Sequence, residues 1–220
     1  MRRWPALLMV GLLAACGSRP PAPDWQVAAH GALERYRQAY LSGADRAAYA
    51  ELARARRELA ATGQAAMLAR AELTRCALQV ASLAFEACQG FEPLRPDVGD
   101  PERAYADYLA GGPAEAALLP PQHRGVAQGG AAALAGIQDP LARLVGAGVL
   151  VRSGRATPQV LQLAADTASA QGWRRPLLAW LGAQLRLAEQ GGRTQEADQL
   201  RRRMALVAGE LSAGSTPSGK

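Results

Sequence analysis

Apolar residues recur every three or four positions along residues 25–211 of this chain. This spacing places them on one face of an α-helix and does not fit the strict alternation of a half-buried β-strand. Glycine pairs and Asp-Pro or Thr-Pro steps separate the apolar stretches, as expected between helices. The pattern therefore predicts an all-α fold, in which each helix buries one face.

Helix breaks at Ser42-Gly43 and Thr62-Gly63 separate the first three predicted helices, the third of which carries Cys76. The glycine- and proline-rich stretch 90–101 is the longest irregular segment and hence a candidate functional loop. Side chains that could cap helices precede or open several segments. These capping candidates are Asp45, Asp139, Thr157 and Thr194. Later helices are expected at 104–109, 121–135, 140–149, 158–171, 173–190 and 194–211.

Paired helices joined by short glycine turns suggest antiparallel hairpins that stack into an α-solenoid. Near the C-terminus stand Trp180-Leu181-Gly182, Gly192 and Glu196-Ala197. This segment resembles the helix-turn-helix unit of tetratricopeptide repeats. The resemblance implies a concave surface that binds a peptide or protein. An irregular helical bundle without repeat ancestry is the alternative.

The N-terminus has the three parts of a secretory signal peptide: a charged start at Arg2-Arg3, a short apolar centre and a small-residue end. The apolar run 6–15 would span about 15 Å as a helix, half of a hydrocarbon core of ~30 Å. It is therefore too short for a permanent membrane span. A buried N-terminal core helix is the alternative interpretation.

The run Leu13-Ala14-Ala15-Cys16 resembles the lipobox of bacterial lipoproteins. The resemblance implies cleavage before Cys16 and diacylglycerol on its thiol, with a further acyl chain such as palmitate in Gram-negative species. Two or three acyl chains anchor a protein stably. Gly17 stands where an aspartate would indicate retention in the inner membrane. By analogy, we expect an outer-membrane anchor with the protein facing the periplasm.

Loss of residues 1–15 would remove two of the 25 basic residues and leave all 19 acidic ones, so the mature chain would carry +4. An exported chain of this charge is not expected to bind nucleic acid. Three basic clusters are either solvated helix faces or contacts to anionic lipid or polysaccharide. They are Arg54/Arg56/Arg57, Arg174/Arg175 and Arg201/Arg202/Arg203. The expected domains are a signal peptide (1–15), a lipidated Pro-rich linker (16–24), a helical domain (25–211) and a disordered tail (212–220).

Cys76 and Cys88 remain once Cys16 carries lipid, and an even pair in an oxidising compartment suggests a disulfide. On one continuous helix, twelve residues would separate their Cα atoms by about 18 Å, whereas a disulfide needs less than about 7 Å. The bond therefore requires the helix to end near Ser82 so that Cys88 folds back. Two buried free thiols are the alternative.

Candidate catalytic groups are few. His30 and His123 have no second His or Cys at metal-ligand spacing, so no metal site is predicted. No phosphate-binding loop, dinucleotide-binding loop or serine nucleophile elbow is present. Lytic transglycosylases use a glutamate usually followed by serine, and Glu72, Glu86 and Glu92 lack that context. We expect neither enzymatic activity nor a cofactor other than the covalent lipid.

The expected function is that of a membrane-tethered helical scaffold, which binds a protein or peptide of the cell envelope through Tyr, Trp and Arg side chains. The competing hypothesis is an envelope enzyme or carrier acting on peptidoglycan or lipid. That hypothesis predicts a deep pocket with a buried carboxylate, or an apolar cavity.

Overall fold

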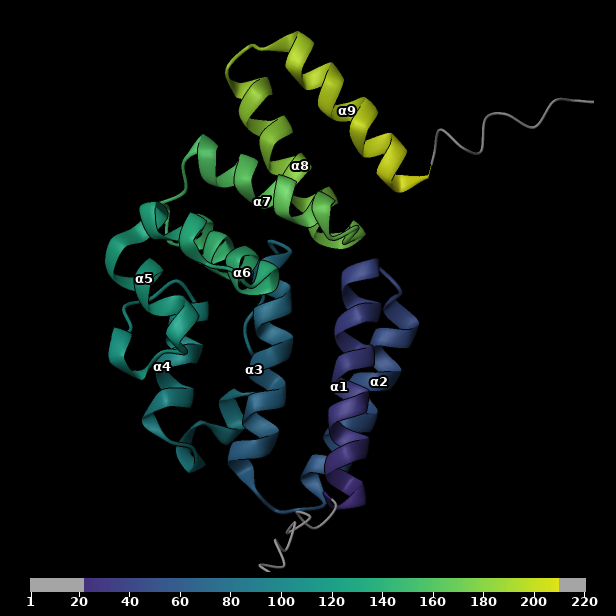
Figure 1. Cartoon of the computed structure of the whole chain (residues 1–220), viewed down its shortest axis with the longest axis vertical. Coiled ribbons are helices and arrows are strands. Elements are labelled where there is room, and N and C mark those ends of the chain that lie inside the picture. Colours follow the sequence, from purple (N-terminus) through teal and green to yellow (C-terminus); the bar gives the residue numbers. More distant parts are fainter. Residues whose placement is uncertain (1–21, 210–220) are drawn as a thin grey trace, which may run out of the picture.

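The computed structural model describes residues 22–209, which contain helices and no β-strand (Figure 1). The predicted all-α class is thus confirmed. Within this range, no helix is both long and apolar enough to cross a membrane. The predicted signal peptide 1–15, the lipidation site Cys16 and the tail 212–220 lie outside the described residues.

The helix boundaries follow most of the predicted breaks. The α-helices are α1 (Asp24–Ser42), α2 (Asp45–Ala60), α3 (Ala65–Ala81), α4 (Asp100–Leu109), α5 (Pro121–Gly129), α6 (Pro140–Arg152), α7 (Pro158–Ala170), α8 (Arg174–Gln190) and α9 (Thr194–Ala208). The 3-10 helices are η1 (Glu92–Asp97), η2 (Ala116–Leu118) and η3 (Gly130–Gly136).

Helix α3 lies in the middle of the fold (Figure 1). The α1–α2 hairpin packs on one side of it, and α4 and α6 pack on the other. Helices α6 to α9 then pack each on the next in sequence, as stacked helical hairpins do. The first part of the chain thus resembles a bundle around α3, and the last part resembles a short stack.

Helices α3 and α6 approach each other closely at Gly148. A Cβ atom placed on Gly148 would lie only 2.2 Å from the backbone oxygen of Val80 in α3. Glycine is therefore required there, because any side chain would collide with backbone that cannot rotate away. This approach brings the two helices together beside the cavity described below.

Two of the four predicted helix caps are confirmed. The Asp139 side chain accepts a hydrogen bond of 2.6 Å from the backbone at the start of α6, and Thr157 caps α7 in the same way. The predictions for Asp45 and Thr194 are wrong, because each is already the first residue of its helix and accepts no capping hydrogen bond from a described residue. In both places a glycine with positive φ stands two residues earlier, so the turn closes sooner than predicted.

The predicted continuous helix 121–135 is also wrong. Helix α5 ends at Gly129, and Gly130 adopts a φ of 63°, which an α-helix does not tolerate. The chain continues as η3. The predicted irregular stretch 90–101 likewise contains η1.

Candidate binding cavity

A cavity of about 500 Å³ lies between α3, α4, α5 and α6. This volume is within the range of sites that hold a compact ligand or a few side chains of a partner. Most of its wall is apolar, and that wall is formed by residues far apart in sequence. The main apolar contributors are Leu73, Ala77, Leu118, Leu119, Leu141 and Val145.

An ion pair lies in the wall of the cavity. Arg70 of α3 donates from its Nε to Glu102 of α4 over 2.9 Å. The two partners differ in exposure: the side chain of Arg70 is 69% exposed and that of Glu102 only 10%. Glu102 lies in the first turn of α4, where the helix dipole favours a negative charge. The carboxylate is thus held in place, while the guanidinium reaches solvent and is available to a ligand.

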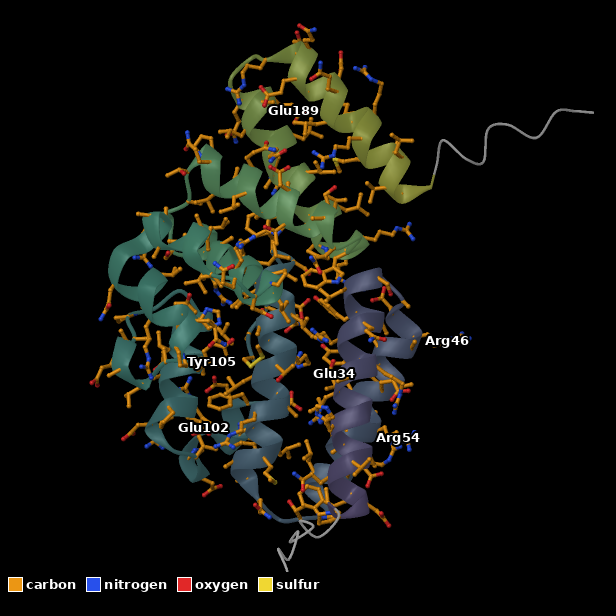
Figure 2. The ribbon with its side chains drawn as sticks, viewed as in Figure 1. Glu34, Arg46, Arg54, Glu102, Tyr105 and Glu189 are labelled. Carbon is orange, nitrogen blue, oxygen red and sulfur yellow. A yellow bond between two sulfur atoms is a disulfide. The ribbon has the colours of Figure 1, made fainter. Side chains whose placement is uncertain are left out.

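Two tyrosines and a histidine pack together at the wall of the cavity. The ring of Tyr105 stacks on that of His123 at a centroid distance of 5.6 Å, and both residues line the cavity. The hydroxyl of Tyr108 lies 3.5 Å from Nδ1 of His123. Figure 2 shows Tyr105 and Glu102 one above the other on the same helix.

Burial determines the charge of His123. Its side chain is almost fully enclosed, and burial lowers its pKa to about 4, although Asp139 opposes the shift. The imidazole is therefore neutral at neutral pH. Its Nε2 has no hydrogen-bond partner among the described residues. A neutral ring can serve as a donor or an acceptor toward a bound group.

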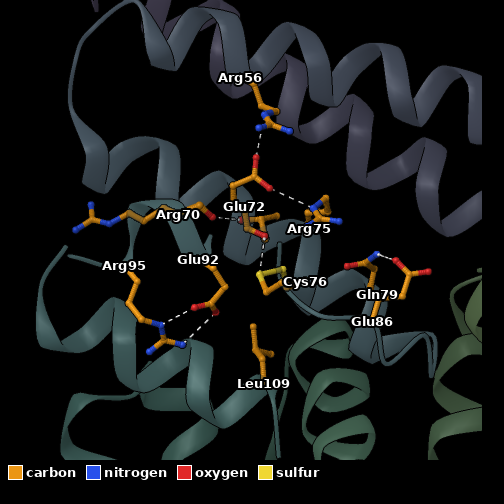
Figure 3. The surroundings of a disulfide bond; sticks show 12 residues. Arg56, Arg70, Glu72, Arg75, Cys76, Gln79, Glu86, Glu92, Arg95 and Leu109 are labelled. Atoms are coloured by element: carbon orange, nitrogen blue, oxygen red, sulfur yellow. Dashed lines mark hydrogen bonds and ion pairs between the residues drawn. A yellow bond between two sulfur atoms is a disulfide. The ribbon is translucent and has the colours of Figure 1, made fainter. Parts of the chain in front are cut away.

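The predicted disulfide is confirmed. Cys76 of α3 is bonded to Cys88, with Cα atoms 5.7 Å apart (Figure 3). Helix α3 ends before Ser82, as the geometric argument required, and Leu83 then turns the chain with a φ of 56°. The segment 82–91, which we call the strap, folds back along α3.

The strap covers a buried carboxylate. Glu72 of α3 is fully buried and accepts a hydrogen bond of 3.2 Å from Arg75 (Figure 3). Arg56 of α2 lies 3.0 Å from Oε1 of Glu72 as an ion pair, although this oxygen accepts no well-oriented hydrogen bond from a described residue. A Cβ atom on Gly90 would come within 2.0 Å of this carboxylate. Glu72 is thus neutralised by two arginines and covered by backbone, which suits a structural role.

The other residues considered from the sequence do not converge on a reactive centre. Glu86 is exposed and accepts a hydrogen bond from Gln79, and exposed Glu92 pairs with Arg95. His30 is exposed on α1, and His123 lies in the first turn of α5. Within residues 22–209, no group of three or more His, Cys, Asp or Glu side chains could hold a metal ion.

The candidate loop 90–101 contributes one of its residues, Pro101, to the lining of the cavity. The cavity itself was not predicted. Its polar groups include Arg70 of α3, Glu102 and Tyr105 of α4, and His123 of α5, which come from separate parts of the sequence. The available signal was His123, which follows Pro120-Pro121 near the predicted start of a helix.

No protein-family model matches the chain, and no curated protein or solved structure is significantly similar to it. What the cavity binds is therefore inferred from its walls and its ion pair.

Proposed function

We propose that this chain is a lipid-anchored binding protein of the bacterial cell envelope. Its helical domain holds an apolar segment of a protein or peptide partner in the cavity between α3, α4, α5 and α6. The observation that carries the proposal is an apolar cavity of about 500 Å³ with an ion pair in its wall. Apolar side chains inserted there would leave water, and polar groups of the partner would pair with Arg70 or Glu102.

The location in the envelope is supported by the sequence. The short apolar run and the motif Leu13-Ala14-Ala15-Cys16 are those of an exported lipoprotein. The disulfide between Cys76 and Cys88 fits an oxidising compartment such as the periplasm. Lipid on Cys16 would hold the protein at the outer membrane, with the helical domain in the periplasm.

A binding role fits the side chains better than catalysis. The fully buried carboxylate, Glu72, is paired with arginines and covered by the strap. The carboxylate in the cavity wall, Glu102, is paired with Arg70. General-acid catalysis needs a carboxyl that can hold and release a proton next to the substrate, and two ion-paired carboxylates do not suit that task. The proposal includes no metal, no nucleic acid and no cofactor beyond the lipid.

A second function, that of a carrier for a lipid, is favoured by the same apolar wall. An acyl chain also fits a cavity of this size and needs few polar partners. The two functions differ in what occupies the cavity in cells, so identification of the occupant separates them.

The decisive experiment places a photo-crosslinking amino acid at Thr74, a half-buried lining residue. The matched control carries the same amino acid at Thr194, which is exposed at the far end of the fold. Irradiation of intact cells is expected to join a protein or peptide to position 74 and not to 194. Filling the cavity by Leu118→Trp should abolish this adduct.

An adduct with the mass of a lipid would favour the carrier instead. The absence of any adduct specific to position 74 would contradict both functions. The anchor is tested separately: mass spectrometry of the protein purified from membranes should show lipid on Cys16 as the first residue. A bare thiol preceded by residues 1–15 would refute it.

A further inference from the structure

Helix α2 presents a basic outer face that contains no acidic residue. Arg46, Tyr49 and Arg57 follow helical spacing along this face, and Arg54 borders it. All four are exposed, Tyr49 to 78%, which is unusual for a large aromatic side chain. The opposite face of α2, with Ala48, Ala55 and Leu59, is buried. We call the exposed side the α2 basic face.

The arginines of this face are free to bind. Among the described residues, no carboxylate forms an ion pair with Arg46, Arg54 or Arg57. Of the three acidic residues of the same helix, Asp45 pairs with Arg175 of α8 and Glu51 with Arg35 of α1, and half-buried Glu58 forms no ion pair with a described residue. Figure 2 shows Arg46 and Arg54 at the outer margin of the molecule, on the side of α2 away from α3.

The basic run of α9, Arg201 to Arg203, is partly compensated. Arg201 donates to both Glu189 and Asp198, at 2.6 and 2.7 Å, so its charge is already compensated. Arg202 and Arg203 of the same run form no ion pair with a described residue, so what distinguishes α2 is three uncompensated arginines beside an exposed tyrosine.

The α2 basic face also lies near the proposed anchor. Helix α2 runs back beside α1 and ends at the same end of the molecule at which α1 begins (Figure 1). Asp24 lies eight positions after Cys16, and this span reaches at most about 29 Å. A 16-residue helix such as α2 is about 24 Å long. A bilayer that holds Cys16 is therefore within reach of the whole face.

We infer that the α2 basic face is a second membrane contact, which binds the headgroups of anionic phospholipids. Guanidinium groups pair with phosphate through two parallel hydrogen bonds, and tyrosine favours the level of the headgroups. Three free arginines beside an exposed tyrosine provide both. This inference rests on the proposed anchoring, because the anchor keeps the face close to lipid.

Such an orientation keeps the cavity accessible. Helix α3 lies between the α1–α2 hairpin and the cavity-lining helices α4 and α5 (Figure 1). With α2 against the bilayer, α4 and α5 lie on the side of the protein that faces away from the lipid.

The test measures binding of the mature chain, residues 16–220 carrying Cys16→Ser, to vesicles, so that neither the signal peptide nor a covalent lipid contributes. Vesicles of phosphatidylcholine are compared with vesicles in which phosphatidylglycerol replaces part of the phosphatidylcholine. We expect preferential, salt-sensitive binding to the anionic vesicles. The triple variant R46A/R54A/R57A should lower the partition coefficient for them roughly 100-fold. Binding to the neutral vesicles should be the same for both proteins.

The matched control, R155A/R186A/R202A, removes the same charge from exposed arginines that form no ion pair with a described residue. Its binding should stay within about threefold of the parent. Circular dichroism confirms that each variant is folded. Equal losses in both triple variants, or no preference for anionic vesicles in the parent, would overturn the inference. Since neither Cys16 nor the cavity takes part, these outcomes are independent of the crosslinking and mass-spectrometry tests.

Discussion

The indole nitrogen of Trp180 donates a hydrogen bond to the backbone oxygen of Ala81, 3.0 Å away, across 99 residues of sequence. Trp180 is fully buried, and Ala81 is the last residue of α3. The helices at the C-terminal end of the fold are therefore fastened to the end of the central helix. A second link lies nearby: Arg175 donates to the backbone oxygen of Tyr40 and packs over its ring at 4.4 Å.

Replacement of Trp180 tests the first link. Trp180→Phe keeps an aromatic ring but leaves the buried oxygen of Ala81 without a donor, which should lower the free energy of unfolding by about 2 kcal/mol. Trp180→Ala should lower it by about 4 kcal/mol, because a cavity is added. Urea denaturation measures both. Half-buried Trp25 serves as the control, and Trp25→Phe should change stability by under about 1 kcal/mol.

Gly148 is predicted to tolerate no side chain. Gly148→Ala should lower the free energy of unfolding by about 3 kcal/mol, because the added methyl group collides with the backbone of Val80. Gly182 provides the comparison, since it also lies inside a helix but has only ordinary contacts around a built Cβ, the nearest at 3.7 Å. Gly182→Ala should be neutral or stabilise the protein by up to about 1 kcal/mol. Equal effects of the two substitutions would contradict the close packing of α3 on α6.

The disulfide should contribute measurably to stability. It closes a loop over a sequence separation of 12, for which loop-closure entropy predicts about 3 kcal/mol. The double variant C76S/C88S should lose this amount in urea denaturation, and a reducing agent should destabilise the parent but not the variant. Two free thiols in the oxidised, folded protein, detected by alkylation and mass spectrometry, would exclude the bond.

His123 should make stability depend on pH. Its pKa is about 4 in the folded protein, because burial disfavours the charged ring, and near 6.5 in an unfolded chain. Between these values the unfolded chain binds a proton that the folded chain does not. The contribution of His123 is thus fully present above pH ~6.5 and is lost as the pH falls toward ~4, by about 3 kcal/mol.

Urea denaturation at several pH values checks this expectation. His123→Gln should flatten the dependence of the free energy of unfolding on pH within that window, because the titrating group is gone. Exposed His30→Gln should leave the dependence unchanged. If His123→Gln and the parent lose stability in parallel on acidification, another group is responsible.

Much of the fold is predictable from local pattern. Apolar spacing gave the helical class, and the Asp-Pro and Thr-Pro steps located the starts of α6 and α7, since a cap followed by proline acts within one turn. The geometric argument on Cys76 and Cys88 placed the end of α3 correctly. Features that depend on residues close together in the sequence can therefore be predicted from the sequence alone.

The cavity was not predictable in this way, because its shape depends on packing between distant segments. Leu73 and Val145 form one wall only because Gly148 lets α6 approach α3. The positive φ of Leu83, which turns the strap back, also has no local signature, since leucine rarely adopts that conformation. Contacts between residues far apart in the sequence determine both the cavity and the turn at Leu83.

The Cys76–Cys88 bond joins two residues that are close in sequence. The hydrogen bond from Trp180 to Ala81, in contrast, can form only after α8 has been synthesised. During the export that we propose, in which the chain emerges from its N-terminal side, this bond could fix the end of α3 before the C-terminal third has crossed the membrane. The backbone oxygen of Ala81, which accepts the hydrogen bond from Trp180, would then already be in place when the last helices fold.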